Sequence, residues 1–235
     1  MKNWGLGRLF VAAMMSLVML PLWAAQEDAV PAPEEAKTAV HTQFDALFRS
    51  VTHQLTNNQE IYLSNPVAYY DFIASTVINL WDSSSTTRAL LGKSHYTKLS
   101  DQQRLSLIAA VDQTLVRYAF EGLESYGGQA FRVADVVVNE KQGMGWVQVL
   151  MESPIIPDIN LDILIKRNDA NAWQAVDIRV KGITYVAIKK HKYREILEEQ
   201  GFNALMDNLT DKNTDFFKAV CAGANNPELE GSAPC

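Results

Sequence analysis

The chain has 235 residues, of which 48% are hydrophobic and 20% are charged, and its formal net charge is −6. This length and composition are sufficient for one folded domain with a sizeable core. Acidic residues outnumber basic ones, and no cluster of Lys and Arg stands out. Nucleic acids and anionic membrane surfaces are bound through such clusters, so the composition argues against both as partners.

Residues 1–25 have the order of a secretory signal peptide. Basic residues come first, an apolar run follows at residues 9–20, and the small residues Ala24 and Ala25 precede the first acidic cluster. The apolar run is shorter than the roughly 20 residues that span a membrane. The order therefore predicts a periplasmic protein whose signal is cleaved after Ala24 or Ala25, with an uncleaved anchor as the open alternative. Residues 26–33 are expected to form a polar linker.

The following segments have helical spacing of their apolar residues. Asn65 and Pro66 are typical of a helix start, because Asn caps the first turn and proline fits into it. Ser100 and Gln103 form a capping box, which marks another start. Glycines mark the helix ends. Four helices are predicted, at about residues 34–55, 65–81, 84–92 and 100–127.

After Gly128 the apolar residues alternate, which indicates strands at residues 131–138, 145–151, 159–166 and 173–180. Short turns join them and favour an antiparallel meander. Two helices, from about 189 to 201 and at 204–209, are expected to close the domain. The predicted fold class is therefore α+β: N-terminal helices packed on a curved, mainly antiparallel four-stranded sheet that encloses a cone-like interior. The domain is predicted to cover residues 34–210, followed by a tail at residues 211–235.

Cys221 and Cys235 are the only two cysteines. In an oxidising compartment, a lone close pair is most simply a disulfide, and the loop it closes contributes up to ~3 kcal/mol of stability. Metal binding is the weaker interpretation, because no His or further Cys stands nearby at ligand spacing. The pair is therefore predicted to form a structural disulfide that holds the tail.

Recognisable catalytic motifs are absent from the sequence: there is no phosphate-binding glycine loop, nucleophile elbow or zinc-binding His pair. The four histidines are scattered along the chain. Asp177 is the one candidate for acid–base catalysis. It interrupts an apolar strand, and a buried carboxylate has a raised pKa that suits a general base. The preferred interpretation is that Asp177 faces outward or bonds to a neighbouring helix end. No enzyme activity, cofactor or metal is expected.

Several short segments follow one another in a distinctive order: Asn65-Pro66, Leu80-Trp81-Asp82, Thr87 to Gly92, Leu99 to Arg104, Tyr118-Ala119, Tyr126 to Gln129, Trp173 to Asp177, Gly182-Ile183-Thr184, and Gly201-Phe202. Together they resemble the MlaC, or toluene-tolerance, family of periplasmic phospholipid-binding proteins, over roughly residues 40–210. The resemblance implies a carrier that moves phospholipid between an inner-membrane ABC transporter complex with an MCE component and an outer-membrane lipoprotein–porin complex. Such transport maintains the lipid asymmetry of the outer membrane.

A phospholipid carrier must shield roughly thirty methylene groups, whose exposure to water costs on the order of 20 kcal/mol. An apolar cavity is therefore expected between the helices and the sheet. The predicted helical wall consists of Trp81, Leu90, Leu91, Leu115, Tyr118, Ala119 and Leu123. The predicted sheet wall consists of Val147, Val149, Met151, Ile163, Ile165, Val176, Ile178 and Val180.

Periodicity does not distinguish a lined cavity from an ordinary filled core. Two other functions therefore stay open beside the carrier. One is a periplasmic enzyme on the same scaffold, with Asp177 and Tyr185 as acid–base groups. The other is an envelope interaction module without a ligand. The family resemblance favours the carrier.

Overall fold

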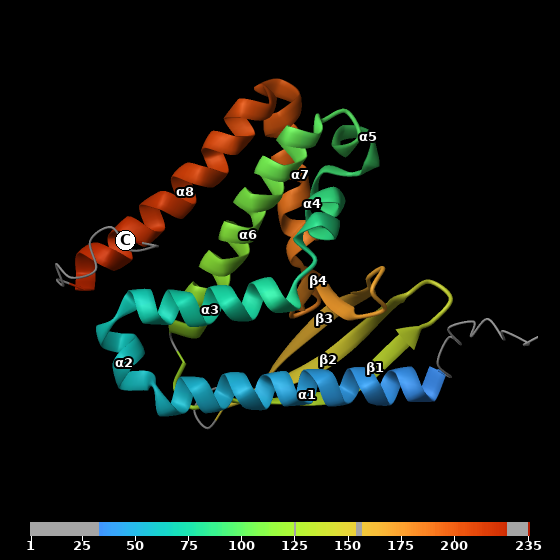
Figure 1. The fold of residues 1–235 in the computed structure, drawn as a ribbon, viewed down its shortest axis with the longest axis vertical. Coiled ribbons are helices and arrows are strands. Elements are labelled where there is room, and N and C mark those ends of the chain that lie inside the picture. The colour runs from blue at the N-terminus through green and yellow to red at the C-terminus, as the bar shows by residue number, and fades with distance from the viewer. Residues whose placement is uncertain (1–32, 125, 154–156, 225–234) are drawn as a thin grey trace, which may run out of the picture. The chain divides into compact units, whose positions relative to one another are not determined.

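The structure, a computed structural model, describes residues 33–124, 126–153, 157–224 and 235 (Figure 1). The predicted signal peptide, residues 1–25, lies outside the described residues, as does nearly all of the predicted linker. In the ranges that are described, no helix is long and apolar enough to cross a membrane.

The first half of the chain is helical, as predicted. The Asn65 side chain accepts a hydrogen bond from the Ala68 amide (3.0 Å). Ser100 and Gln103 bond reciprocally through their amides and side chains, so both predicted caps are confirmed. Two short helices, α2 and α5, were not predicted. The elements are α1 (Pro33–Asn57), α2 (Gln59–Ser64), α3 (Pro66–Leu80), α4 (Ser83–Leu91), α5 (Lys93–Tyr96) and α6 (Asp101–Glu124).

The second half forms one open antiparallel sheet of strand order β1-β2-β3-β4-β5, so the predicted meander is confirmed. The expected number of four strands was one too low, because residues 183 and 184 pair with the end of β4 before the chain turns into α7. The elements are β1 (Ala130–Asn139), β2 (Met144–Glu152), β3 (Ile159–Arg167), β4 (Trp173–Val180), β5 (Ile183–Thr184), α7 (Tyr185–Glu199) and α8 (Gly201–Ala224).

Helix α8 is much longer than the small helix expected at residues 204–209. Leu205, Leu209 and Phe217 are all buried, so residues beyond 210 pack in the core instead of forming only a tail. Asn213 is also buried, and its amide donates hydrogen bonds to the Thr114 hydroxyl (3.1 Å) and the Ala110 carbonyl (3.3 Å) of α6. The predicted disulfide between Cys221 and Cys235 is present at the end of this helix.

The buried apolar residues form two clusters. The sheet cluster contains Val40 and Phe44 of α1 together with residues of all four long strands. In the helical cluster, residues of α3, α4, α6, α7 and α8 pack on one another, together with Leu55 from the end of α1. Figure 1 shows the same division: α1 runs along the sheet, and α6, α7 and α8 gather on the other side of α3.

The two clusters meet at the corner between α3 and α4, where Trp81 packs against both. The Trp81 indole donates to the Thr86 hydroxyl (2.7 Å), which in turn donates to the carbonyl of Val176 (2.6 Å). The Asp82 amide donates to the carbonyl of Ala175 (2.8 Å). These bonds attach the helical layer firmly to β4.

Candidate functional site

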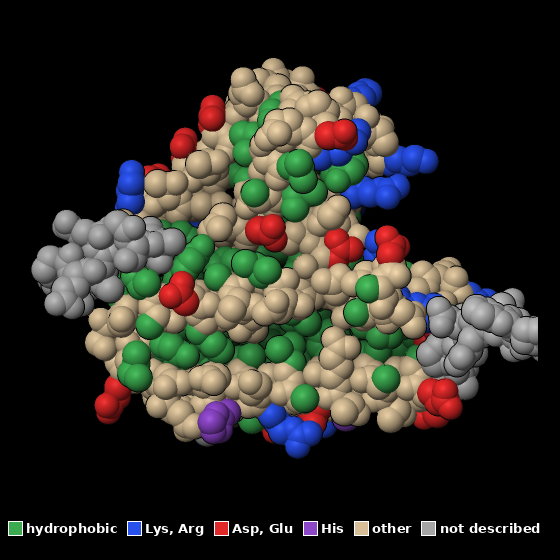
Figure 2. Space-filling model, in the orientation of Figure 1, with side chains coloured by type: hydrophobic (Ala, Val, Ile, Leu, Met, Phe, Trp, Pro, Cys, Tyr) green, Lys and Arg blue, Asp and Glu red, His purple; other side chains and the backbone are tan. Residues whose placement is uncertain are grey.

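A groove of about 300 Å³ separates α1 from α3. Leu47 and Val51 line it from α1, and Phe72 and Leu80 line it from α3. Its remaining lining is polar but uncharged: Gln43, Ser50, Ser75, Thr76 and Asn79. In Figure 2, hydrophobic side chains gather along this boundary. The groove is therefore an apolar slot whose rim carries hydroxyl and amide groups.

A larger cavity, of about 490 Å³, lies where α1, α2, α3, α6 and α8 meet. Helix α2 forms one wall and has no buried residue of its own. Its Leu63 is 74% exposed, so the cavity is open to solvent on that side. The lining is mostly apolar or aromatic: Leu55, Gln59, Tyr62, Leu63, Pro66, Tyr69, Phe120, Leu123, Tyr126, Phe216, Ala219 and Val220.

The groove and the cavity are neighbours. Tyr62, which lines the cavity, stacks on Phe72, which lines the groove, with ring centroids 5.4 Å apart. Tyr62 also packs against Tyr69 at 5.3 Å. Aromatic rings therefore lie between the two hollows.

The predicted helical wall lies mainly in the helical cluster. Leu90, Leu91 and Leu115 are buried there, and Tyr118, Ala119 and Leu123 are partly buried against it. Leu123 lines the larger cavity. Trp81, predicted for the same wall, contacts both clusters and is not among the residues that line the two hollows.

Seven of the eight residues predicted for the sheet wall share one face, because residues paired across antiparallel strands point to the same side. Val147 pairs with Ile163, which pairs with Ile178. The seven are Val147, Val149, Met151, Ile163, Ile165, Ile178 and Val180. Four of them, Val147, Val149, Ile163 and Ile165, are buried in the sheet cluster.

Val176 and Val180 differ from the other residues of the predicted sheet wall, the first in its strand pairing and the second in its exposure. The register between β3 and β4 shifts between Leu164 and Ile165, which leaves Val176 as the extra residue of a β-bulge. Its side chain is buried, but it has no partner in the ladder. Val180, at the end of β4, is 41% exposed.

Most residues that line the larger cavity were not among the predicted walls. Leu55 carried a usable signal, since it continues the apolar stripe of α1. Tyr62 and Leu63 lie in α2, which is too short to show a helical period. Phe216 and Val220 belong to the part of α8 that was expected to be a tail.

Asp177 has a structural role at the start of α7. Its side chain is buried (6% exposed), and one carboxylate oxygen accepts hydrogen bonds from the amides of Ile178 (2.9 Å) and Val186 (3.2 Å). Burial raises the pKa of Asp177 above its ordinary value, although these amides partly oppose that effect. The preferred sequence interpretation, a bond to a neighbouring helix end, is therefore confirmed.

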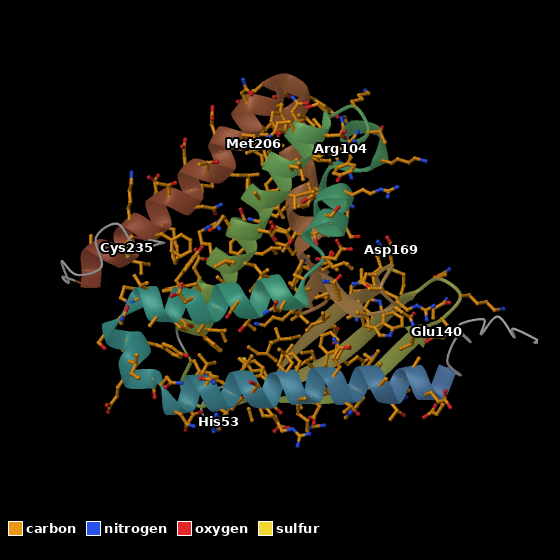
Figure 3. The ribbon with its side chains drawn as sticks, viewed as in Figure 1. His53, Arg104, Glu140, Asp169, Met206 and Cys235 are labelled. Atoms are coloured by element: carbon orange, nitrogen blue, oxygen red, sulfur yellow. A yellow bond between two sulfur atoms is a disulfide. The ribbon has the colours of Figure 1, made fainter. Side chains whose placement is uncertain are left out.

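The other polar candidates are dispersed. Tyr185 is buried with its hydroxyl 3.4 Å from that of Tyr193, and burial raises the pKa of both. Figure 3 shows His53 on the side of α1 away from α3, while His95 pairs with Glu198 at 2.9 Å. Among the described residues, no group of three His, Cys, Asp or Glu side chains has the arrangement of a metal site.

Comparison with known proteins relates this geometry to one family. A family model described as MlaC protein matches residues 45–211. The fold is similar to the solved structure of a phospholipid-binding protein from Ralstonia solanacearum in complex with a phospholipid, with a TM-score of 0.66 and 13% identity. That match covers 75% of this chain and 98% of the other. No curated protein matches the sequence.

Proposed function

The chain belongs to the MlaC family, and on this basis we propose that it is a periplasmic carrier that holds a phospholipid between its helices. The observation that carries the proposal is the pair of neighbouring apolar hollows, the groove between α1 and α3 and the cavity beside α2. Their volumes lie in the range of about 300–1,000 Å³ that is usual for ligand sites. The phospholipid bound in the similar Ralstonia protein supports the same ligand class.

The packing of the helices suits the entry of an acyl chain. Helix α1 is held by the sheet, whereas α3 packs on α6 and α8. An acyl chain that enters between α1 and α3 therefore leaves the packing of α1 on the sheet and of α3 on α6 and α8 intact. The polar groups at the groove rim, such as Gln43 and Asn79, suit the glycerol and ester region of a lipid, and the charged head group stays in solvent.

The wider role is taken from the family. The protein is proposed to be exported by residues 1–25 and to move lipid between an inner-membrane ABC transporter complex with an MCE component and an outer-membrane lipoprotein–porin complex. Carriage of this kind needs no catalytic group. It agrees with the structural role of Asp177, which accepts a hydrogen bond from the Val186 amide at the start of α7, and this role disfavours the enzyme alternative.

Mass spectrometry of organic extracts tests the proposal directly. The mature protein is purified from periplasm without detergent and is compared with a mock purification. We expect phospholipid in near-stoichiometric amount, with mixed head groups because the hollows present no charged side chain to a head group. Lipid no more abundant than in the mock sample would refute the carrier function.

Substitutions in the groove locate the lipid. Leu47→Asp places a charge on its α1 wall, and Ser75→Trp fills it from α3 without adding charge. Both changes are expected to reduce bound lipid at least about tenfold, because a carboxylate does not share an apolar slot with an acyl chain and an indole occupies its volume. Ile78→Asp is the control, since Ile78 lies on α3 but is 59% exposed. Equal lipid content in all three variants would place the ligand elsewhere.

A further inference from the structure

Basic residues are concentrated in one short segment of this acidic chain. Between Asp177 and Glu195 there are six Lys and Arg residues and no acidic residue: Arg179, Lys181, Lys189, Lys190, Lys192 and Arg194. If these six charges are set aside from the net charge of −6, the rest of the chain carries −12. The expectation that no cluster of Lys and Arg stands out is therefore wrong for this segment, which comprises the end of β4, β5 and the first half of α7.

The two arginines of this segment are occupied elsewhere. Arg179 pairs with Asp162 at 2.8 Å, and Arg194 donates to the carbonyl of Leu90 at 3.0 Å. By contrast, Lys181, Lys190 and Lys192 are exposed, and only Lys192 has an ion pair among those found in the described residues, with Glu195 at 3.4 Å. The lysines therefore supply the accessible positive charge.

The same segment exposes aliphatic side chains. Val180, Ile183 and Ile188 are 41%, 58% and 58% exposed, and Val180 pairs with Ile183 across the hairpin. Lys181 and Gly182 form its two-residue turn, with φ angles of 50° and 86°, the conformation of a tight protruding hairpin. Ile188 follows one turn into α7. Lys192 follows Ile188 by four residues and lies on the same side of α7, whereas Lys190, two residues from each, lies on another side. The basic aliphatic surface thus consists of Val180, Lys181, Ile183, Ile188 and Lys192.

We infer that the basic aliphatic surface binds the anionic phospholipid surface of a membrane. Aliphatic side chains that protrude among lysines enter the head-group region of a bilayer, and the ammonium groups remain at the level of the phosphates. The remainder of the chain is strongly acidic and is repelled by the same surface. This charge separation orients the protein with β5 and the start of α7 toward the bilayer, and it keeps the contact weak and reversible.

Co-sedimentation of the mature protein with lipid vesicles tests the inference. We expect binding to vesicles of phosphatidylethanolamine with phosphatidylglycerol, little binding to pure phosphatidylcholine vesicles, and release in about 0.5 M salt, where charges are strongly screened. Lys181→Glu is expected to weaken binding about thirtyfold, and Lys181→Gln about fivefold, because each lysine near an anionic surface contributes separately. Ile183→Ser tests the apolar part and is expected to weaken binding several-fold.

Lys141→Glu, in the exposed turn between β1 and β2, is the matched charge control and is expected to bind like the unchanged protein. The lipid content of all purified variants, measured by mass spectrometry, is expected to stay the same, so that loss of vesicle binding is separable from loss of cargo. Absence of binding to anionic vesicles at low salt would overturn the inference. Equal weakening by Lys141→Glu and Lys181→Glu would also overturn it, because net charge alone would then govern the contact.

Discussion

The buried carboxylate of Asp177 makes the stability of the protein depend on pH. Burial raises the pKa of Asp177 in the folded state, so the folded protein holds this proton at pH values where the unfolded chain has released it. By linkage, the free energy of unfolding falls as the pH rises above the ordinary value of 3.8 and continues to fall until the folded-state pKa is passed.

Asp177→Asn removes this titration but keeps a side-chain oxygen for the amides of Ile178 and Val186. We expect the variant to gain stability relative to the unchanged protein as the pH rises from 3.8. Asp177→Ala removes the acceptor and is expected to lose about 1–3 kcal/mol at neutral pH. Urea unfolding at a series of pH values measures both. A parallel pH dependence for Asp177→Asn and the unchanged protein would contradict the assignment.

The apolar periodicity of the sequence predicted best those helices and strands in which no polar residue interrupts the apolar pattern. The four long strands match the predicted bounds to within one residue at each end, because each is a β-rich run between short turns. Helix α8 was shortened in the prediction because Asn213 stands in the stripe formed by Leu205, Leu209 and Phe217, and a polar residue there ends an apolar pattern. Its partners Thr114 and Ala110 lie on α6, a tertiary contact that sequence spacing does not show.

The same limit applies to the candidate site. Alternation placed seven sheet residues on one face, but the bulge at Val176 breaks the period without any glycine or proline to mark it. Alternation also does not show that α1 covers that face near β1 and β2, which makes Val147 and Val149 core residues and leaves the open space between helices. The location of the cavity depends on how the helices pack, and no single helix encodes that.

The disulfide at the end of α8 offers a test at the scale of one element. Cys221 and Cys235 are separated by 14 positions, and closing a loop of this size contributes up to about 3 kcal/mol. Replacing both by Ala is expected to lower the free energy of unfolding by less than that amount, because Phe217 still anchors the helix in the core. Urea unfolding with and without reductant provides the measurement, and reductant is expected to leave the double variant unaffected. A loss well above 3 kcal/mol would show that the last turn of α8 supports more of the fold.

At the scale of the whole described domain, the sheet cluster and the helical cluster meet mainly at the corner between α3 and α4. Trp81, Thr86 and Asp82 attach the helical layer to β4, while the α1 side of the boundary contains the groove. The domain is therefore closed by hydrogen bonds at one end of the boundary and open at the other. A ligand in the groove adds apolar contacts where the protein itself has few.

Lipid is consequently expected to stabilise the protein. A ligand at one hundred times its dissociation constant adds about 2.7 kcal/mol, which corresponds to a rise of roughly 5–10 °C in the unfolding temperature for a chain of this size. Delipidated protein should regain this difference when phospholipid is restored, and hydrogen exchange should slow in α1 and α3 more than in β2 and β3. Leu47→Asp is the control, since it is expected to show no rise on addition of lipid. Stabilisation of this variant equal to that of the unchanged protein would mean that the lipid does not lie between α1 and α3.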